Sequence, residues 1–510
     1  MPDANVLPDA TTTDGAFLVL AIVLPATGVL LSFVLGGRYA ERIAAVLLPS
    51  GFILASIIFV DVWRSGHRLI YIVGDWKPPL GIALRADGLS AAMMVAMAIV
   101  ICAVAIFAHA DFGTRAGSVE ARAPFAFWIL LMAIWGAMNM VFLGGDLFTL
   151  YVAIELLTFA AVPLVCLDGR AETLQAALRY LLFALLGSIL YLVGTALLYG
   201  SYATLDVVLL SRRVQMEPAT LVAATLMTIG LFAKTALFPL HLWLPPAHAG
   251  APAAASAVLS AVVVKGSFFI VVRLWFDVMP GMLGPAGAQL FGALGTAAIV
   301  FGSVVALRQQ RLKLLIAYST VAQIGYLFLM FPLALDAVSV QLQGGGALAG
   351  GMLQAISHAT AKAAMFMAAG LIYAVLGHDR IAELGGVARA LPMTVFAFAL
   401  GGVSLIGLPP SGGFLAKWLL LEAAVATGQW WWAIVLLAGG LFTSAYMFIV
   451  LSSAVAPSSE PLKPRIAVPR YQEAAALALA LTSLLLGLVA LGPVEILQVG
   501  RPDSMMVGPR

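Results

Sequence analysis

Charge is scarce in this 510-residue sequence: Asp, Glu, Lys and Arg together make up 10% of it, whereas 62% of the residues are hydrophobic. A soluble domain carries about 25% charged residues, most of them on its surface. So few charges exclude an ordinary soluble protein, because they cannot cover the surface of a chain of this size. The net charge of +3 is also too small to favour binding to nucleic acid.

Residue patterns that build cofactor sites are scarce as well. The two cysteines, Cys102 and Cys166, both lie in apolar runs. Their position excludes a disulfide scaffold, a cysteine-ligated iron–sulfur cluster and a CxxC redox site. The sequence has no GxGxxG motif after a strand and no phosphate-binding loop, which excludes nucleotide chemistry. We therefore expect no cofactor and no metal site in this chain.

Long apolar runs fill most of the sequence. A helix needs about 20 apolar residues to cross the roughly 30 Å hydrocarbon layer of a bilayer. The strands of a membrane barrel would instead show about ten residues of apolar and polar alternation. We predict an all-α polytopic membrane protein with about 14 transmembrane helices, at residues 16–35, 43–63, 89–110, 124–144, 147–167, 178–200, 219–240, 253–276, 286–307, 314–332, 346–376, 392–421, 430–453 and 473–492.

The distribution of basic residues predicts how these helices are oriented. Loops after odd-numbered spans hold about 14 of the 27 Lys and Arg residues, against about 9 in the other loops and tails. The odd-numbered group includes Arg38, Arg42, Arg170, Arg179, Arg308, Arg311 and Lys313. By the positive-inside rule, both termini lie on the non-cytoplasmic side of the cell (inner) membrane. One outer loop opposes this bias with Arg64, Arg68, Lys77 and Arg85.

No basic residue precedes the first predicted span, so we expect no signal peptide there. Inside the predicted spans, by contrast, lie six titratable residues: Glu155, Lys234, Lys265, His358, Lys362 and Lys417. An ionisable side chain at the bilayer centre costs about 2.5–3.5 kcal/mol on insertion scales, so each needs a physical reason. These side chains either reach the membrane surface or form fixed ion pairs between helices, or they mark an ion pathway. Because they occupy five different spans, we favour the pathway.

Two of the lysines stand beside interruptions of their helices. Lys234 precedes Pro239 by five residues, and proline removes a backbone donor and opens a helix. Lys417 follows the Gly/Pro-rich stretch 407–413, which cannot form a continuous helix. Interrupted backbone at membrane depth survives only where protein or water surrounds it. A hydrated half-channel at each interruption is the functional interpretation, and a packing kink is the structural one.

The paired interruptions indicate an internal duplication. Interrupted helices in corresponding halves of a chain are the sequence sign of transporter repeats. We predict two five-helix repeats, 124–276 and 286–453, which are inverted relative to each other because each has an odd number of helices. Residues 1–123 contribute three earlier helices, and residues 473–510 contribute a final helix and tail.

The histidines near these lysines allow more than one role. His358 and Lys362 are four residues apart and so share one face of a helix. A lone His beside a Lys lacks the ligand number of a metal site. His241 and His248 are expected at a membrane rim, where either a structural hydrogen bond or proton shuttling would suit them.

From about residue 124 to 450 the sequence resembles the antiporter-type proton-pumping subunits of respiratory complex I, of Mrp-type cation/proton antiporters and of membrane-bound hydrogenases. The segments that carry the resemblance are GGDLFTLYVAIELL, LFAKTALFPLHLWLPPAHAGAP, SAVVVKGSFFIVVRLW, KLLIAYSTVAQIGY, SHATAKAAMFMAAG and GLPPSGGFLAKW. Each segment alone is unspecific, whereas all six in this order are highly specific.

The resemblance implies a role for each buried group. Glu155 would be the fifth-helix carboxylate that pairs with Lys234. Lys265 would be the central bridging lysine, assisted by His358 and Lys362. These assignments rest on the matching motifs and not on the composition or spacing of the sequence.

The resemblance also implies a role for Lys417, and the sequence differs from the family pattern in two places. Lys417 would face the far-side exit, and a lysine here differs from the branch of the family that ends its pathway in a carboxylate. Pro246 stands where many members have Asp, which weakens the case for an acidic group at that rim. About 18 residues follow the last predicted span, so we expect no long lateral helix of the kind found in the largest complex I member.

The expected function is proton translocation by one subunit of a multi-subunit membrane complex, with other membrane subunits and lipid as partners. Sodium/proton exchange stays open, and the complex could be a quinone oxidoreductase, a hydrogenase, a multi-subunit antiporter or an inorganic-carbon uptake system. One alternative is a stand-alone secondary transporter of a small solute. Another is a scaffold whose ion pairs are purely structural.

Overall fold

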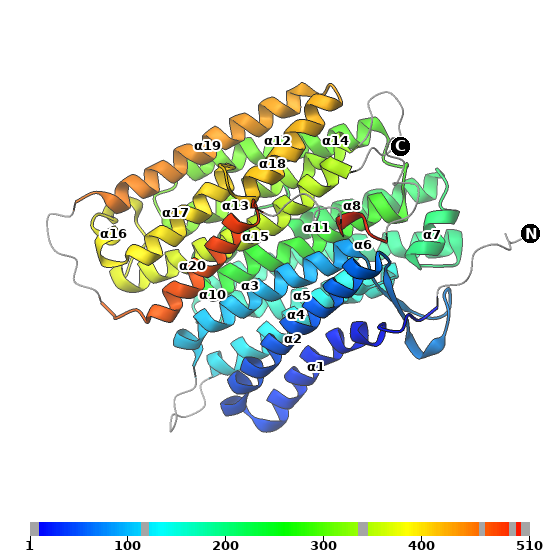
Figure 1. Cartoon of the computed structure of the whole chain (residues 1–510), viewed down its shortest axis with the longest axis horizontal. Coiled ribbons are helices and arrows are strands. Elements are labelled where there is room, and N and C mark those ends of the chain that lie inside the picture. The colour runs from blue at the N-terminus through cyan, green and yellow to red at the C-terminus, as the bar shows by residue number, and fades with distance from the viewer. Residues whose placement is uncertain (1–9, 114–121, 335–344, 458–464, 489–495, 501–510) are drawn as a thin grey trace, which may run out of the picture.

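The computed structural model describes residues 10–113, 122–334, 345–457, 465–488 and 496–500, and it shows a bundle of helices with one small hairpin (Figure 1). The α-helices are α1 Ala16–Leu35, α2 Gly37–Ser65, α3 Gly88–Phe112, α4 Arg122–Leu143, α5 Leu147–Val165, α6 Ala171–Tyr202, α7 Val207–Arg213, α8 Pro218–Thr235, α9 Leu244–Gly250, α10 Ala253–Val258, α11 Val264–Arg273, α12 Pro285–Leu307, α13 Leu312–Phe328, α14 Met330–Leu333, α15 Gly345–Leu376, α16 Val387–Ala390, α17 Pro392–Ile406, α18 Gly412–Ala426, α19 Trp430–Val455 and α20 Arg470–Leu485. Short 3₁₀ and π segments are η1 Val73–Asp75, η2 Leu259–Val263, η3 Leu274–Val278, η4 Ile381–Glu383 and η5 Ile496–Gln498, and the strands are β1 Leu69–Ile72 and β2 Ala83–Ala86.

The predicted class, an all-α polytopic membrane protein, is confirmed. Within the described residues, 12 helices are long and apolar enough to cross a membrane. The other two predicted spans are shorter helices in the structure. Span 392–421 is divided into α17 and α18. Span 473–492 overlaps α20, which begins at Arg470 and ends at Leu485, and the last four residues of that span lie outside the described part of the chain.

Several helices begin earlier than their apolar runs. The helix α2 starts at Gly37 and not at residue 43, so Arg38 and Arg42 lie in its first turns and not in a loop. The helix α6 starts at Ala171 and not at residue 178, so Arg179 lies in its third turn and not in a loop. Apolar length marks the part of a helix that lies in lipid, and polar residues extend the same helix into the interface.

Both predicted interruptions are present. The helix α8 ends at Thr235, four residues before Pro239, which is the position where the proline ring would clash with a helical carbonyl. Ala236 then adopts a left-handed conformation, with φ of 59°, before α9 begins. In the second interruption α17 is followed by Gly407, with φ of 89°, and Ser411 caps the start of α18 through its side chain.

The span from α10 to η3 runs through the middle of the bundle. It is one continuous 26-residue span in which two π-helical segments, η2 and η3, alternate with α10 and α11. Its most apolar window is entirely buried, in contrast with about one third of the corresponding window in α2 or α19. Figure 1 shows α1 and α2 at one edge of the bundle and α19 at the opposite edge, with α11 and α15 between them.

A β-hairpin at one end of the bundle was not expected from the sequence. Strands β1 and β2 pair antiparallel, with Leu69 opposite Ala86 and Ile72 opposite Ala83. Both described ends of the chain contact the hairpin or the start of α3 beside it. Thr12 N–H donates to Ile70 O of β1 at 2.9 Å, and Gly88 N–H of α3 donates to Val499 O at 3.0 Å. The first and last described segments therefore lie on the same face of the bundle. The two five-helix repeats and their inversion stay predictions.

Candidate functional site

An ion pair joins α5 to the end of α8. Lys234 Nζ donates to Glu155 Oε1 at 3.1 Å and to Thr158 Oγ1 at 2.8 Å. Ser188 Oγ of α6 donates to the same carboxylate oxygen. The lysine is 7% exposed, and the Glu155 side chain is 17% exposed. At 3.1 Å and an effective dielectric constant near 20, the two charges attract each other by about 5 kcal/mol.

Close helix packing holds this pair in place. A side-chain carbon at Gly187 of α6 would lie 2.6 Å from the carbonyl oxygen of Gly230, and one at Gly230 of α8 would lie 2.3 Å from that of Gly187. Only glycine allows two backbones to approach so closely. Trp243 Nε1–H, from the segment after the break, donates to Ala233 O at 2.9 Å and so satisfies a carbonyl freed at the helix end.

A second pair joins the central span to α15. Lys265 is fully buried, and its Nζ lies 2.5 Å from Ser260 O and 2.6 Å from His358 Nδ1. Ser260 belongs to the π-helical segment η2. The other ring nitrogen, His358 Nε2, is buried without a hydrogen-bond partner among the described residues. The amine and the imidazole are therefore within hydrogen-bonding distance of each other.

Lys362 lies one turn beyond His358 on α15 and is fully buried. Its amine donates to Ile316 O of α13 at 3.0 Å and to Ser319 Oγ of the same helix. Thus the two residues share a helix face, as predicted, but contact different neighbours: His358 contacts the central span, and Lys362 contacts α13.

Lys417 lies on α18, beside the break between α17 and α18. Its amine donates to Leu405 O at 2.7 Å and to Ile406 O at 3.0 Å, two carbonyls at the end of α17. The amine also lies 4.2 Å from the centre of the Tyr326 ring. Carbonyls at a helix C-terminus carry a partial negative charge, which stabilises a cation there. Lys417 is therefore paired with backbone and an aromatic ring, whereas Lys234 is paired with a carboxylate.

Polar side chains continue from Lys417 toward the middle of the bundle. Gln323 Nε2 donates to Leu405 O at 3.2 Å, and Gln354 Nε2 donates to Gln323 Oε1 at 2.9 Å. Ser357, next to His358 on α15, shares a hydrogen bond of 2.8 Å with Ser404 of α17. A chain of buried hydrogen-bonding groups thus extends from the second interruption to α15.

His241 and His248 are both buried within the bundle, at 3% and 0% exposure, and their expected place at a membrane rim stays a prediction. The segment after the α8 break folds back into the bundle, and the His248 ring stacks on Phe366 of α15 with 4.5 Å between centroids. Lys313 was expected in a loop but is also buried, in the first turn of α13, where its amine donates to Ala251 O at 3.1 Å.

Three hydroxyl or carbonyl partners of the buried charged groups were not predicted: Ser188, Ser260 and Ser319. Each comes from a helix or a π-turn whose position depends on tertiary packing. A polar residue within an apolar run, facing the same side as a small residue, is the only signal that the sequence offers for them.

Comparisons with known proteins show the family of this chain. The family described as NADH:quinone oxidoreductase/Mrp antiporter, TM, matches residues 144–443. NADH-quinone oxidoreductase subunit N of Desulforudis audaxviator is 32% identical over 93% of this chain and 95% of its own length. A Na(+)/H(+) antiporter subunit of Alkalihalophilus pseudofirmus is 30% identical over 83% of this chain and 84% of its own.

The fold also has a solved counterpart. A chain of the Mrp complex from Dietzia sp. DQ12-45-1b superposes with a TM-score of 0.86 over 98% of this chain and 100% of its own, at 23% identity. Residues 144–443, which match the family, contain all six predicted titratable residues. The chain therefore belongs to the NADH:quinone oxidoreductase/Mrp antiporter transmembrane family.

Proposed function

We propose that this chain is a proton-translocating subunit of a multi-subunit membrane complex. Its relatives carry the names of subunits of NADH-quinone oxidoreductases and of Na(+)/H(+) antiporters. The observation that supports the proposal most strongly is the buried pair of Glu155 and Lys234, with an amine-to-carboxylate distance of 3.1 Å at a helix break. A complex of this kind, embedded in the cell membrane, supplies the partner subunits.

The mechanism uses the competition between burial and charge pairing. Burial disfavours the charged form of an amine, whereas a nearby carboxylate favours it. An attraction of about 5 kcal/mol is large enough to decide whether the amine holds its proton. Movement of Glu155 toward or away from Lys234 would therefore load or release the proton.

From Lys234 the proton would pass to Lys265 and then to the face of α15 that carries His358 and Lys362. Lys417 would release it on the other side of the membrane. Two observations support the steps after Lys265: Lys265 is in direct contact with His358, and polar groups continue from α15 to the carbonyls that bind Lys417.

The space around Lys234 favours a proton over an organic solute. A cavity of about 10 Å³ lies beside its amine, lined by Thr158, Tyr180 and Ser267 among others. This is about the volume that one water molecule requires. A substrate-sized pocket would need about 300 Å³ or more. The arrangement therefore suits proton transfer through a single water and leaves no room here for a small organic substrate.

Sodium/proton exchange is the second candidate. What favours it is the name of two relatives, both of which are Na(+)/H(+) antiporter subunits. The Glu155 carboxylate, however, is already engaged by Lys234 and Ser188. We therefore assign the proton pathway to this chain and leave the exchange of sodium to the complex as a whole.

We further propose that both termini face the non-cytoplasmic side. Thr12 and Val499 both form hydrogen bonds with the hairpin region. The first and last described segments therefore lie on the same side of the membrane. Basic residues such as Arg170, Arg308 and Arg311 lie at the opposite ends of the helices, between α5 and α6 and between α12 and α13. By the positive-inside rule that opposite face is cytoplasmic.

Proton flux through vesicles containing the complex tests the proposed function. A potassium diffusion potential drives the flux, and a pH-sensitive dye records it. We expect Lys234→Ala and Lys417→Ala each to reduce the flux by at least about tenfold, because each removes a proton-carrying group. Lys77→Ala, at an exposed loop lysine, is the matched control and should leave the flux unchanged. Intact flux in both buried-lysine variants would show that protons take another route.

A further inference from the structure

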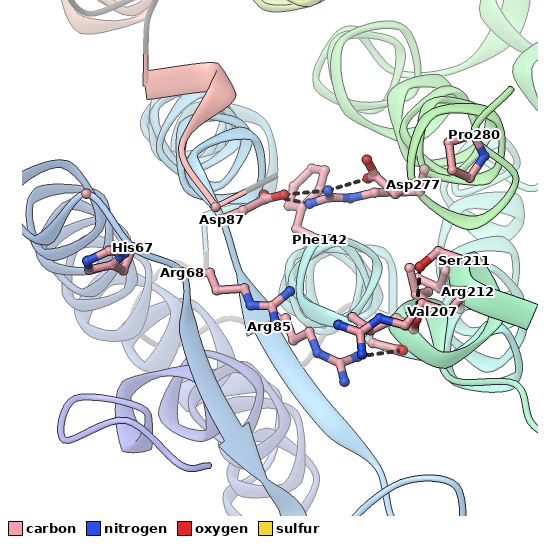
Figure 2. A pocket seen from close by; sticks show the side chains of 17 residues that line it. His67, Arg68, Arg85, Asp87, Phe142, Val207, Ser211, Arg212, Asp277 and Pro280 are labelled. Atoms are coloured by element: carbon pink, nitrogen blue, oxygen red, sulfur yellow. Dashed lines mark hydrogen bonds and ion pairs between the residues drawn. The ribbon is translucent and has the colours of Figure 1, made fainter. Parts of the chain in front are cut away.

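Two cations inside the bundle are held by carboxylates. Arg273 lines a cavity of about 770 Å³ beside the hairpin, where its Nη2 lies 2.6 Å from Asp87 Oδ1 and its Nη1 lies 2.6 Å from Asp277 Oδ2. Figure 2 shows both aspartates, with dashed lines to the guanidinium between them. In the proposed proton pathway, Lys234 is paired with Glu155 in the same manner.

Lys417, at the end of the proposed pathway, is held differently. Among the described residues, its amine forms no hydrogen bond or ion pair with a side chain. It donates to Leu405 O at 2.7 Å and to Ile406 O at 3.0 Å, and it lies over the Tyr326 ring, 4.2 Å from the ring centre. The lysine is 9% exposed and the tyrosine is fully buried. The cation is therefore stabilised by two backbone carbonyls and the face of one aromatic ring.

Two glycines leave room for this contact. Gly407, at the end of α17, has φ of 89°, and a side-chain carbon there would lie 2.8 Å from Lys417 Cδ. The stem of the lysine thus passes directly across the helix break. Gly439 of α19 lies against the far end of the ring, where a side-chain carbon would overlap the hydroxyl oxygen of Tyr326. The break places the amine, and α19 fixes the ring.

The strength of this contact suits a group that must both take up and release a proton. A ring face attracts a cation through its quadrupole, and the attraction grows where water is excluded. It is weaker than the attraction of a carboxylate, which acts between two full charges. A fixed carboxylate would hold the proton at the end of the pathway, whereas burial without any partner would keep the amine neutral. The ring provides a stabilisation between these two extremes.

We propose that Tyr326 is a positioning residue for proton release, and that its ring takes the place of a carboxylate partner for the terminal lysine. This inference rests on the proposed function, in which Lys417 is the exit group. The ring carries no proton itself. It raises the fraction of complexes in which the amine of Lys417 is charged, and each charged amine is one proton ready to leave.

Graded weakening of the ring face tests this role without a change of shape. Tyr326→Phe keeps the ring, and phenylalanines with one, two or three ring fluorines at position 326 remove its negative face in steps. The assay is dye-detected proton flux in vesicles that contain the whole complex, with assembled complex measured in the same preparation. We expect Tyr326→Phe to keep the original flux within about twofold, and the three-fluorine ring to conduct about tenfold more slowly than Tyr326→Phe. The intermediate rings should fall between these two in order.

Phe328 provides the matched control, because it lies two residues further along α13 and is also fully buried. Its ring packs against other rings, with centroid distances of 5.1 Å to Phe232 and 5.7 Å to Phe268. The same fluorinated series at position 328 changes the ring face without a cation to feel it. We expect its flux to stay within about twofold of the original throughout.

Four results would overturn the proposal. A flux that does not fall as fluorines are added at position 326 would show that the ring face does not support the amine. An equal graded loss at position 328 would assign the effect to packing, and a tenfold loss in Tyr326→Phe would assign it to the hydroxyl group. In these three cases a low flux in Lys417→Ala would leave the proposed function intact. Full flux in Lys417→Ala would instead overturn the proposed function and this role of Tyr326 with it.

Discussion

Neutralising Glu155 tests the pairing on which proton loading depends. In Glu155→Gln the side chain keeps its shape and its contact with Ser188, but the charge opposite Lys234 disappears. The attraction lost is about 5 kcal/mol at an amine-to-carboxylate distance of 3.1 Å and an effective dielectric constant near 20. The carboxylate side chain is 17% exposed, so solvent screens part of this energy. Even one third of it would change an equilibrium or a rate by more than tenfold.

We therefore expect the proton flux of Glu155→Gln to fall by at least about tenfold while the protein still folds and assembles. The assay is dye-detected flux in vesicles under a fixed potassium diffusion potential, with the amount of assembled complex measured in the same preparation. Glu172→Gln, at an exposed glutamate at the start of α6, is the matched control. A flux in Glu155→Gln within twofold of this control would refute the reasoning.

A charge swap separates a relay from a scaffold. In the double variant with Glu155→Lys and Lys234→Glu, the ion pair is retained but reversed. A purely structural pair would tolerate this exchange, and flux would return toward the original rate. In a relay the amine must stand at the end of α8, so the double variant should remain as inactive as either single variant. Double-mutant cycles of this kind isolate the pairwise contribution.

Three further predictions concern the neighbours of the buried lysines. Ser188→Ala removes a hydrogen bond to the Glu155 carboxylate and should lower the flux by up to about tenfold, without loss of assembled complex. Ser319→Ala removes a hydroxyl that accepts from the buried lysine of α15, and we expect a flux decrease of similar size; an unchanged rate would remove Ser319 from the pathway. Gly230→Val should destabilise the chain by about 1–3 kcal/mol through a clash between α6 and α8, seen as a lower melting temperature, whereas Gly200→Ala, with open space around it, should not.

The sequence predicts the spans and the interruptions well because both are local properties. Apolar length fixes where a helix lies in lipid, and Pro239 or the stretch 407–413 breaks a helix wherever it is placed. The six titratable residues were found for the same reason, since a charge within an apolar run is visible without any knowledge of the fold. Confirmation of their position does not confirm their role, which stays a prediction.

Properties that depend on packing between helices were not predictable. The approach of Gly187 to Gly230 brings Ser188 to Glu155, and no local pattern shows that these two helices meet. The burial of His248 depends on how the chain folds back after the α8 break, which no local pattern of residues shows. Strands β1 and β2 are only four residues each, which is too short for a clear alternation of polar and apolar residues.

The central claim is that protons cross the membrane through a connected series of buried amines, and Lys265 is the member that joins the two halves. The most direct measurement is therefore the proton flux of Lys265→Met, a variant that keeps an unbranched side chain one atom shorter and removes the group that carries the proton. Lys77→Met is the control for the loss of one lysine. The account predicts that flux in assembled Lys265→Met falls by at least about tenfold while the control is unaffected. An assembled Lys265→Met complex that conducts protons as fast as the control would contradict it.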